Sequence, residues 1–205
     1  EASFAGQQST FLNISGKEQV VTSVRECWAS LFGARAIFYR EETGFDHLEV
    51  GIAVPIQRMI HSETSGVLFT VEPVSNDGTK MVIEAIHGLG EAIVSGALTP
   101  DLYMVEKGSL KITLKKIVKQ EWELVRNPEF VPELDDNTIK VDIPADRQDG
   151  QKLSDEDLVS LARLGRKIEE RYGHPQDIEW AREGDQLYIL QSRPITTLGQ
   201  VPDAL

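Results

Sequence analysis

Two short segments near the end of the chain decide the fold: Asp177-Ile178-Glu179-Trp180-Ala181 and Leu187-Tyr188-Ile189-Leu190-Gln191-Ser192-Arg193-Pro194. The polar stretch 182–186 separates them and contains Gly184, which is typical of a turn. Apolar and polar residues alternate in both segments, as in strands that are buried on one side only. The sequence therefore predicts a β-hairpin over residues 177–194.

The alternation assigns the side chains of this hairpin to two faces. Successive side chains of a strand point to opposite sides, so Asp177 and Glu179 share one face. If Ala181 pairs with Leu187, Asp177 lies opposite Gln191, and Arg193 joins the same polar face. The other face is expected to be apolar, with Ile178, Trp180, Tyr188 and Leu190.

The polar face of the hairpin has the donor set of a metal–phosphate site. Carboxylate and amide oxygens such as those of Glu179 and Gln191 suit Mg²⁺, which takes the rest of its shell from water and phosphate. The Arg193 guanidinium offers a forked donor to a phosphate oxygen. The spacing alone favours the plainer alternative, a solvated hairpin whose polar side chains pair across the strands.

The remaining chain predicts an α+β fold in which antiparallel sheet predominates. One amphipathic helix begins at Lys17 and stops before Gly33, and another begins after the capping pair Ser154 and Asp157 and ends at Gly173. We expect residues 127–151 to be an exposed irregular excursion. The expected strands, in chain order, are Leu48–Ile60, Gly66–Val71, Met81–Ile86, Leu102–Val105, Leu110–Val118, Asp177–Ala181 and Leu187–Gln191.

The composition limits the classes of function. The chain has 205 residues and a formal net charge of −12, which opposes general binding to nucleic acid; one small polyphosphate with a divalent cation remains compatible with it. A single cysteine, Cys27, excludes an internal disulfide and predicts a reducing, cytoplasmic location. No apolar run reaches the roughly 18–20 residues of a membrane-spanning helix.

Three further positions are candidates for ligand binding, each with a plain structural alternative. The small residues around Gly6, with Thr10 nearby, would let backbone N–H groups approach a phosphate, but most such stretches are only loops. His87-Gly88-Leu89-Gly90-Glu91 permits a similar approach or forms a tight turn from strand to helix. Gln57 is expected at the end of an apolar strand, where its amide binds a ligand or satisfies the backbone.

Taken together, several segments resemble one known family. In order, they are Ala2-Ser3-Phe4-Ala5-Gly6-Gln7-Gln8, Ile56-Gln57-Arg58-Met59, Gly66-Val67-Leu68-Phe69-Thr70, Gly88-Leu89-Gly90-Glu91 and the two hairpin segments. This set resembles the ATP-grasp nucleotide-binding domain of phosphoenolpyruvate synthase and pyruvate phosphate dikinase, which rifampicin phosphotransferase shares. The resemblance covers about residues 2–198. It implies that residues 1–198 are the C-terminal part of this nucleotide-binding domain and that 199–205 are a linker toward a phosphohistidine domain.

The resemblance implies ATP and Mg²⁺ as cofactors and assigns roles to single residues. Glu179 and Gln191 match the metal and nucleotide ligands, with Asp177 beside them, and Arg193 matches a catalytic arginine that contacts phosphate. Gly6 and Thr10 match the loop that covers the phosphates, and Gln57 matches a residue near the nucleotide. Family members pass a phosphoryl group from ATP to a histidine on a separate domain, which delivers it to pyruvate or another acceptor.

The resemblance also implies partner domains that these residues do not include: an N-terminal lobe, a phosphohistidine domain and a pyruvate-binding barrel. We therefore expect a fragment that binds ATP weakly or not at all and is inactive by itself. Two alternatives stay open at this stage. One is the same domain of a rifampicin phosphotransferase, and the other is a non-catalytic nucleotide-binding or interaction module.

Overall fold

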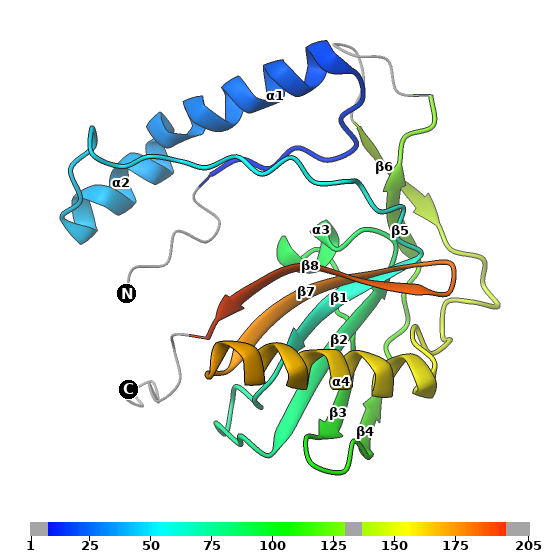
Figure 1. The fold of residues 1–205 in the computed structure, drawn as a ribbon. Coiled ribbons are helices and arrows are strands. Elements are labelled where there is room, and N and C mark those ends of the chain that lie inside the picture. Colours follow the sequence, from blue (N-terminus) through cyan, green and yellow to red (C-terminus); the bar gives the residue numbers. More distant parts are fainter. Residues whose placement is uncertain (1–7, 130–136, 196–205) are drawn as a thin grey trace, which may run out of the picture. The chain divides into compact units, whose positions relative to one another are not determined.

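A six-stranded antiparallel sheet with one long helix against it is the largest element of the fold (Figure 1). The computed structural model describes residues 8–129 and 137–195. The chain divides into two units: residues 1–59 with 126–138, and residues 60–125 with 139–205. Each unit is considered by itself below. In the described part of the chain, no helix is long and apolar enough to span a membrane.

The sheet belongs to the second unit, and each of its neighbouring strands is antiparallel. β1 lies at its centre and pairs on one side with β2, which follows it directly, and on the other with β7, more than 100 residues further along. The predicted antiparallel α+β fold is therefore confirmed. Across the sheet the strands are β4 (Ile112–Lys116), β3 (Asp101–Glu106), β2 (Lys80–His87), β1 (Thr64–Phe69), β7 (Gln176–Glu183) and β8 (Gln186–Pro194).

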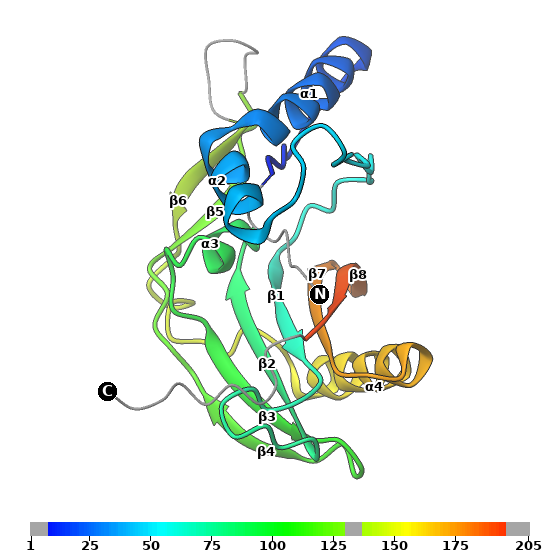
Figure 2. The same ribbon diagram turned by 90° about the vertical axis from the view of Figure 1, so that its left-hand side faces the viewer.

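Helix α4 (Asp155–Tyr172) covers one face of this sheet, as both views show (Figures 1 and 2). The Ser154 side chain accepts a hydrogen bond from the Asp157 backbone N–H at 3.1 Å, and Gly173 ends the helix in the left-handed conformation. Both predicted helix ends are confirmed. The core lies between α4 and the sheet and consists of Leu68, Met81, Ile83, Ala85, Tyr103, Val105, Leu153, Leu158, Leu161, Ala162, Ile178 and Trp180.

Gly66 in β1 allows the largest core side chain to lie across the centre of the sheet. A Cβ atom at this position would stand 1.8 Å from the Glu84 carbonyl oxygen and 2.8 Å from the Trp180 ring. Because real Cβ atoms do not approach other atoms so closely, only glycine fits between β2 and the ring. Trp180 is 1% exposed, and its indole belongs to the core between the sheet and α4.

A buried ion pair anchors the segment that leads into α4. Lys152 Nζ lies 3.0 Å from Asp101 Oδ1, and both side chains are almost completely buried. The Tyr103 hydroxyl donates to Asp101 Oδ2 at 2.6 Å, and Lys152 Nζ also donates to the Val118 carbonyl oxygen. Burial and the neighbouring Asp101 carboxylate raise the pKa of Tyr103. Each charge is satisfied by the others, so removal of one partner would leave a buried charge unpaired.

The sequence His87–Glu91 forms a tight turn from β2 into the short helix α3 (Glu91–Val94). Gly88 has a φ of 83°, and a Cβ there would lie 2.5 Å from the Leu124 carbonyl oxygen. The glycine is thus required by local packing and backbone conformation. Of the two interpretations of this sequence, the structure supports the turn.

Residues 127–151 are more regular than predicted. β5 (Trp122–Arg126) and β6 (Thr138–Asp142) form a separate two-stranded sheet, so the expected irregular excursion contains a strand. Lys140 Nζ lies 4.3 Å from the centroid of the Trp122 ring, a cation–π contact between the two strands. The alternation within β6 is weak because most of its side chains are exposed, and the sequence pattern therefore missed it.

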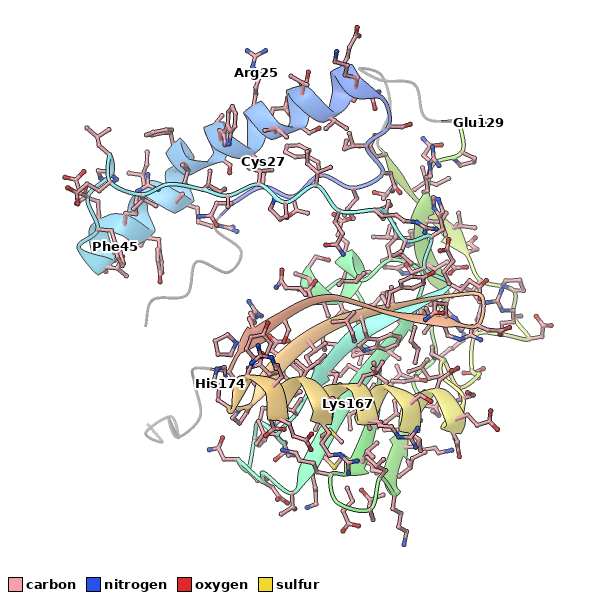
Figure 3. All side chains as sticks on the ribbon, viewed as in Figure 1. Arg25, Cys27, Phe45, Glu129, Lys167 and His174 are labelled. Carbon is pink, nitrogen blue, oxygen red and sulfur yellow. The ribbon has the colours of Figure 1, made fainter. Side chains whose placement is uncertain are left out.

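The first unit is mainly helical. It contains α1 (Lys17–Ala29), a 3₁₀ turn (Ser30–Phe32) and α2 (Ala34–Thr43). The predicted helix from Lys17 is confirmed, its helical turns end before Gly33 as expected, and α2 was not predicted. Cys27 on α1 is buried, and burial raises the pKa of its thiol (Figure 3). The Cys27 thiol also donates a hydrogen bond to the Ser9 carbonyl oxygen at 3.5 Å.

The predicted strand Leu48–Ile60 is wrong. No residue of this segment belongs to a strand, although its composition favours one. A strand exists only when its backbone groups pair with a neighbour, and no described part of the chain pairs with this segment. Apolar side chains such as Ile56 are consequently left exposed. Gln57 therefore does not end a strand.

Candidate functional site

The polar side chains of the hairpin lie on the sheet face opposite α4, which we call the second face. The α4 side takes Ile178 and Trp180 into the core, so the alternating side chains of Asp177 and Glu179 point to the other side. At one end the second face is covered by the turn before α3, where Ser65 Oγ donates to the Gly88 carbonyl at 2.6 Å. The middle of β7 and the end of β8 remain accessible.

A β-bulge sets the register of the hairpin and corrects the predicted pairing. Ala181 pairs with Tyr188, and Asp177 lies opposite Arg193, whereas the sequence predicted Leu187 and Gln191 as their partners. The connection is a two-residue turn with Gly184 at a φ of 57°, shorter than the five-residue turn expected. The register then shifts between Glu179 and Trp180, where β8 contains one extra residue.

The bulge also changes which β8 residues face the core. Leu187 and Ile189 pack against the core cluster, in place of the predicted Tyr188 and Leu190. Trp180 pairs with Ile189 on the core side, as an apolar pair should. The extra residue returns Gln191 and Arg193 to the second face, so the predicted gathering of four polar side chains is kept with different partners.

Asp177 holds the Arg193 guanidinium. Arg193 donates to Asp177 Oδ2 from Nη2 at 2.6 Å and from Nε at 2.8 Å. The Asp177 side chain is 12% exposed and that of Arg193 is 44% exposed, so the carboxylate is the fixed partner and the guanidinium reaches toward solvent. Both bonds use one carboxylate oxygen and leave further guanidinium N–H groups to bind an anion. Asp177 therefore positions Arg193.

Glu179 and Gln191 stand directly opposite each other on neighbouring strands. Gln191 Nε2 donates a long hydrogen bond of 3.4 Å to Glu179 Oε1. A flip of the Gln191 amide group would turn its oxygen, in place of its nitrogen, toward the same position. Burial raises the pKa of the Glu179 carboxyl, the charge of Asp177 raises it further, and Arg193 partly opposes both. A cation beside Glu179 would remove the cost of its ionisation.

The sequence pattern missed a third carboxylate on the second face. Glu84 of β2 pairs with Val67 of β1, and Val67 pairs on its other side with Glu179. Paired residues of neighbouring strands share a face, so Glu84 and Glu179 flank Val67 on the same side of the sheet. Burial raises the pKa of Glu84, and the charge of Asp177 raises it further. The one available signal was a single acid inside the apolar strand Lys80–His87.

The other predicted site residues belong to the first unit or lie outside the described residues. Thr10 and Gln57 lie exposed in the first unit, and Gly6 lies outside the described residues, as does the linker 199–205. Their roles at a nucleotide remain predictions. His174 follows α4 (Figure 3), and its ring Nδ1 lies 2.7 Å from Nε2 of Gln176. The His174 ring thus interacts with the side chain of Gln176, two residues further along the chain.

The donor set of the hairpin fits Mg²⁺ with few protein ligands. Glu179 and Gln191 offer one carboxylate and one amide oxygen from adjacent strands, and Mg²⁺ commonly keeps waters and phosphate oxygens for its other positions. Within residues 8–129 and 137–195, no group of three or more His, Cys, Asp or Glu side chains could hold a metal ion.

Comparisons with known proteins place the chain among nucleotide-binding domains. The family model described as pyruvate phosphate dikinase, AMP/ATP-binding domain, matches residues 1–204. The phosphoenolpyruvate synthase of Pyrococcus furiosus is 50% identical over 204 residues, which cover 97% of this chain and 24% of that protein. A probable phosphoenolpyruvate synthase of Methanothermobacter thermautotrophicus is 51% identical over 203 residues, covering 99% of this chain and 28% of its own.

A second group of relatives carries a different name. The rifampicin phosphotransferase of Bacillus subtilis is 44% identical over 203 residues, which cover 99% of this chain and 22% of that protein. The chain thus spans about a quarter of the length of the curated relatives that it matches.

Proposed function

Because this chain belongs to the pyruvate phosphate dikinase AMP/ATP-binding domain family, we propose that its second face binds Mg-ATP as the first step of a phosphotransferase reaction. The observation that carries the proposal is the hairpin register, which places Glu179 opposite Gln191 and Asp177 opposite Arg193 on one face. We infer that this chain is the part of an ATP-grasp domain that holds the metal and the phosphates.

Each of the four side chains has a distinct part in this proposal. Glu179 and the Gln191 amide oxygen would hold the cation, which supplies charge neutralisation of the phosphate oxygens when it is bound. Arg193 would donate its free N–H groups to the transferred phosphoryl group and stabilise the charge that develops there. Asp177 would keep the guanidinium in place through the 2.6 Å and 2.8 Å contacts, so that little ordering is needed when the nucleotide binds.

We further infer that Gly6 and Thr10 close over the phosphates and that Gln57 lies near the nucleotide. These assignments rest on the family resemblance of their sequence segments. Thr10 and Gln57 are exposed and therefore accessible to a ligand.

The acceptor of the phosphoryl group is a proposal about the whole protein. We infer transfer to a histidine on another domain, as the family resemblance implies, and from there to pyruvate, as the name of the Pyrococcus furiosus relative suggests. The relatives are about four times as long as this chain, which leaves room for an N-terminal lobe, a phosphohistidine domain and an acceptor-binding barrel. The isolated chain is expected to bind ATP weakly and to complete no turnover.

Rifampicin is the second candidate acceptor, because two rifampicin phosphotransferases are 44% identical to the chain over nearly its whole length. Identity to phosphoenolpyruvate synthases is higher, at 50–51% for several relatives, and favours pyruvate. Incubation of the intact protein with Mg-ATP and each acceptor in turn distinguishes the two, because only the true acceptor becomes phosphorylated.

The site itself is tested by Glu179→Gln combined with Gln191→Ala in the intact protein. We expect ATP-dependent phosphorylation to fall by at least about 100-fold, since ligands of both the metal and the phosphates are lost. The exposed Glu106 on β3 provides the control Glu106→Gln, which should retain activity. Unchanged activity of a folded double variant would instead support a non-catalytic binding module.

A further inference from the structure

Glu84 occupies a position in the second face that the proposed phosphate and metal contacts do not use. Across the sheet, the paired residues Leu102, Glu84, Val67, Glu179 and Gln191 form one continuous row. Glu84 is separated from Glu179 by one intervening strand, which places their Cα atoms roughly 10 Å apart. Gln191 and Arg193 lie on the far side of Glu179 from Glu84.

The Glu84 carboxylate is half-buried, and no cation in the described part of the chain pairs with it. No ion pair or side-chain hydrogen bond joins it to another residue within 8–129 and 137–195, and its row neighbours, Val67 and Leu102, are apolar. A carboxylate in such surroundings is costly unless a ligand donates hydrogen bonds to it. Burial and the charge of Asp177 raise the pKa of Glu84, which agrees with the absence of a nearby positive charge.

The charge of the nucleotide decides which part of it faces Glu84. Phosphate oxygens carry negative charge and would be repelled, so the phosphates belong beside Arg193 and the cation. The part of a nucleotide beyond its phosphates is uncharged and carries hydroxyl donors on the ribose. Carboxylates bind ribose hydroxyls in this way in dinucleotide-binding folds, and the apolar neighbours of Glu84 suit the carbon face of a sugar.

A shared metal is a weaker explanation for Glu84. Glu84, Asp177 and Glu179 do not form a three-ligand group that could hold a metal in the described structure. The Asp177 carboxylate is also already occupied by Arg193.

We propose that Glu84 binds the ribose of the nucleotide, with its carboxylate accepting a hydrogen bond from a ribose hydroxyl. This inference rests on the proposed binding of Mg-ATP to the second face. It makes Glu84 a residue that selects ribonucleotides, distinct from the residues that hold the phosphates.

The test measures the affinity of the intact protein for Mg-ATP and for its 2′-deoxy and 3′-deoxy analogues. The unmodified protein should bind ATP about tenfold more tightly than at least one analogue, the cost of one lost charge-assisted hydrogen bond. Glu84→Ala should abolish this preference and change binding of that analogue by less than about threefold. Glu106→Gln, on the neighbouring strand, should keep the preference.

Other outcomes overturn the inference. If the preference for ATP over its deoxy analogues survives Glu84→Ala, or is absent from the unmodified protein, Glu84 does not bind the ribose. If Glu84→Ala weakens all three nucleotides equally and raises the Mg²⁺ concentration needed, Glu84 is a metal ligand. If Glu84→Ala or Glu84→Gln changes only the preference for ATP over GTP, Glu84 contacts the base. Absence of Mg-ATP binding by the unmodified protein would refute the proposed function itself, which separates the two failures.

Discussion

The substitution Glu179→Gln should stabilise the metal-free chain while it weakens nucleotide binding. Asp177 and Glu179 are two residues apart on the same face of β7, which separates their carboxylates by about 7 Å. Two negative charges at that distance repel by about 0.6 kcal/mol in water and about 2.4 kcal/mol at an effective dielectric constant near 20. Arg193 offsets part of this repulsion, so we expect a net gain of about 0.5–1 kcal/mol at pH 7.

The sign of the pH dependence follows from the raised pKa of Glu179. In the unfolded chain the carboxyl ionises at its ordinary pKa of about 4.3, whereas in the folded chain it ionises at a higher pH. The protonated carboxyl thus favours the fold below about pH 4, and this contribution is lost as the pH rises through the folded pKa. The advantage of Glu179→Gln should therefore be present at pH 7 and disappear at pH 4.

Urea unfolding of the metal-free chain, followed by circular dichroism, measures this difference. The midpoint of Glu179→Gln should lie about 0.3 M above that of the unmodified chain at pH 7 and coincide with it at pH 4. The exposed Glu129, outside the sheet, provides a matched Glu129→Gln control with no expected shift (Figure 3). A lower midpoint at pH 7, or an equal gain at both pH values, would refute the reasoning.

Three further substitutions test the packing that supports the site, each by urea unfolding of the chain. Gly66→Ala should cost about 3 kcal/mol or more, because its Cβ would stand 1.8 Å from the Glu84 carbonyl oxygen; a loss under 1 kcal/mol would contradict this contact. Lys152→Met should cost about 3–5 kcal/mol by leaving Asp101 buried and unpaired, and an unchanged midpoint would show that the pair contributes nothing. Ser154→Ala should cost about 1 kcal/mol through loss of the helix cap, whereas Ser154→Asp should restore it.

Local signals in the sequence were sufficient for the elements that depend on them. The helix after Ser154 has its cap, its apolar stripe and its terminal Gly173 within 20 residues, and all three are as predicted. The hairpin was also recognisable from alternation and Gly184. Its register was not, because alternation alone does not mark the extra residue that β8 carries opposite the step from Glu179 to Trp180.

The composition of the site required the order of the strands. Glu84 lies near Glu179 only because β1 pairs with β2 on one side and with β7 on the other. Nothing in the sequence around β7 indicates that pairing. The segment Leu48–Ile60 shows the opposite limit, since its strand-like composition has no partner strand in the described chain.

A calorimetric titration of the intact protein tests most directly whether the second face binds Mg-ATP. We predict that the unmodified protein binds Mg-ATP and that Glu179→Gln with Gln191→Ala weakens binding by at least about 100-fold, while circular dichroism stays the same. Equal affinities for the unmodified protein and the folded double variant would contradict the claim.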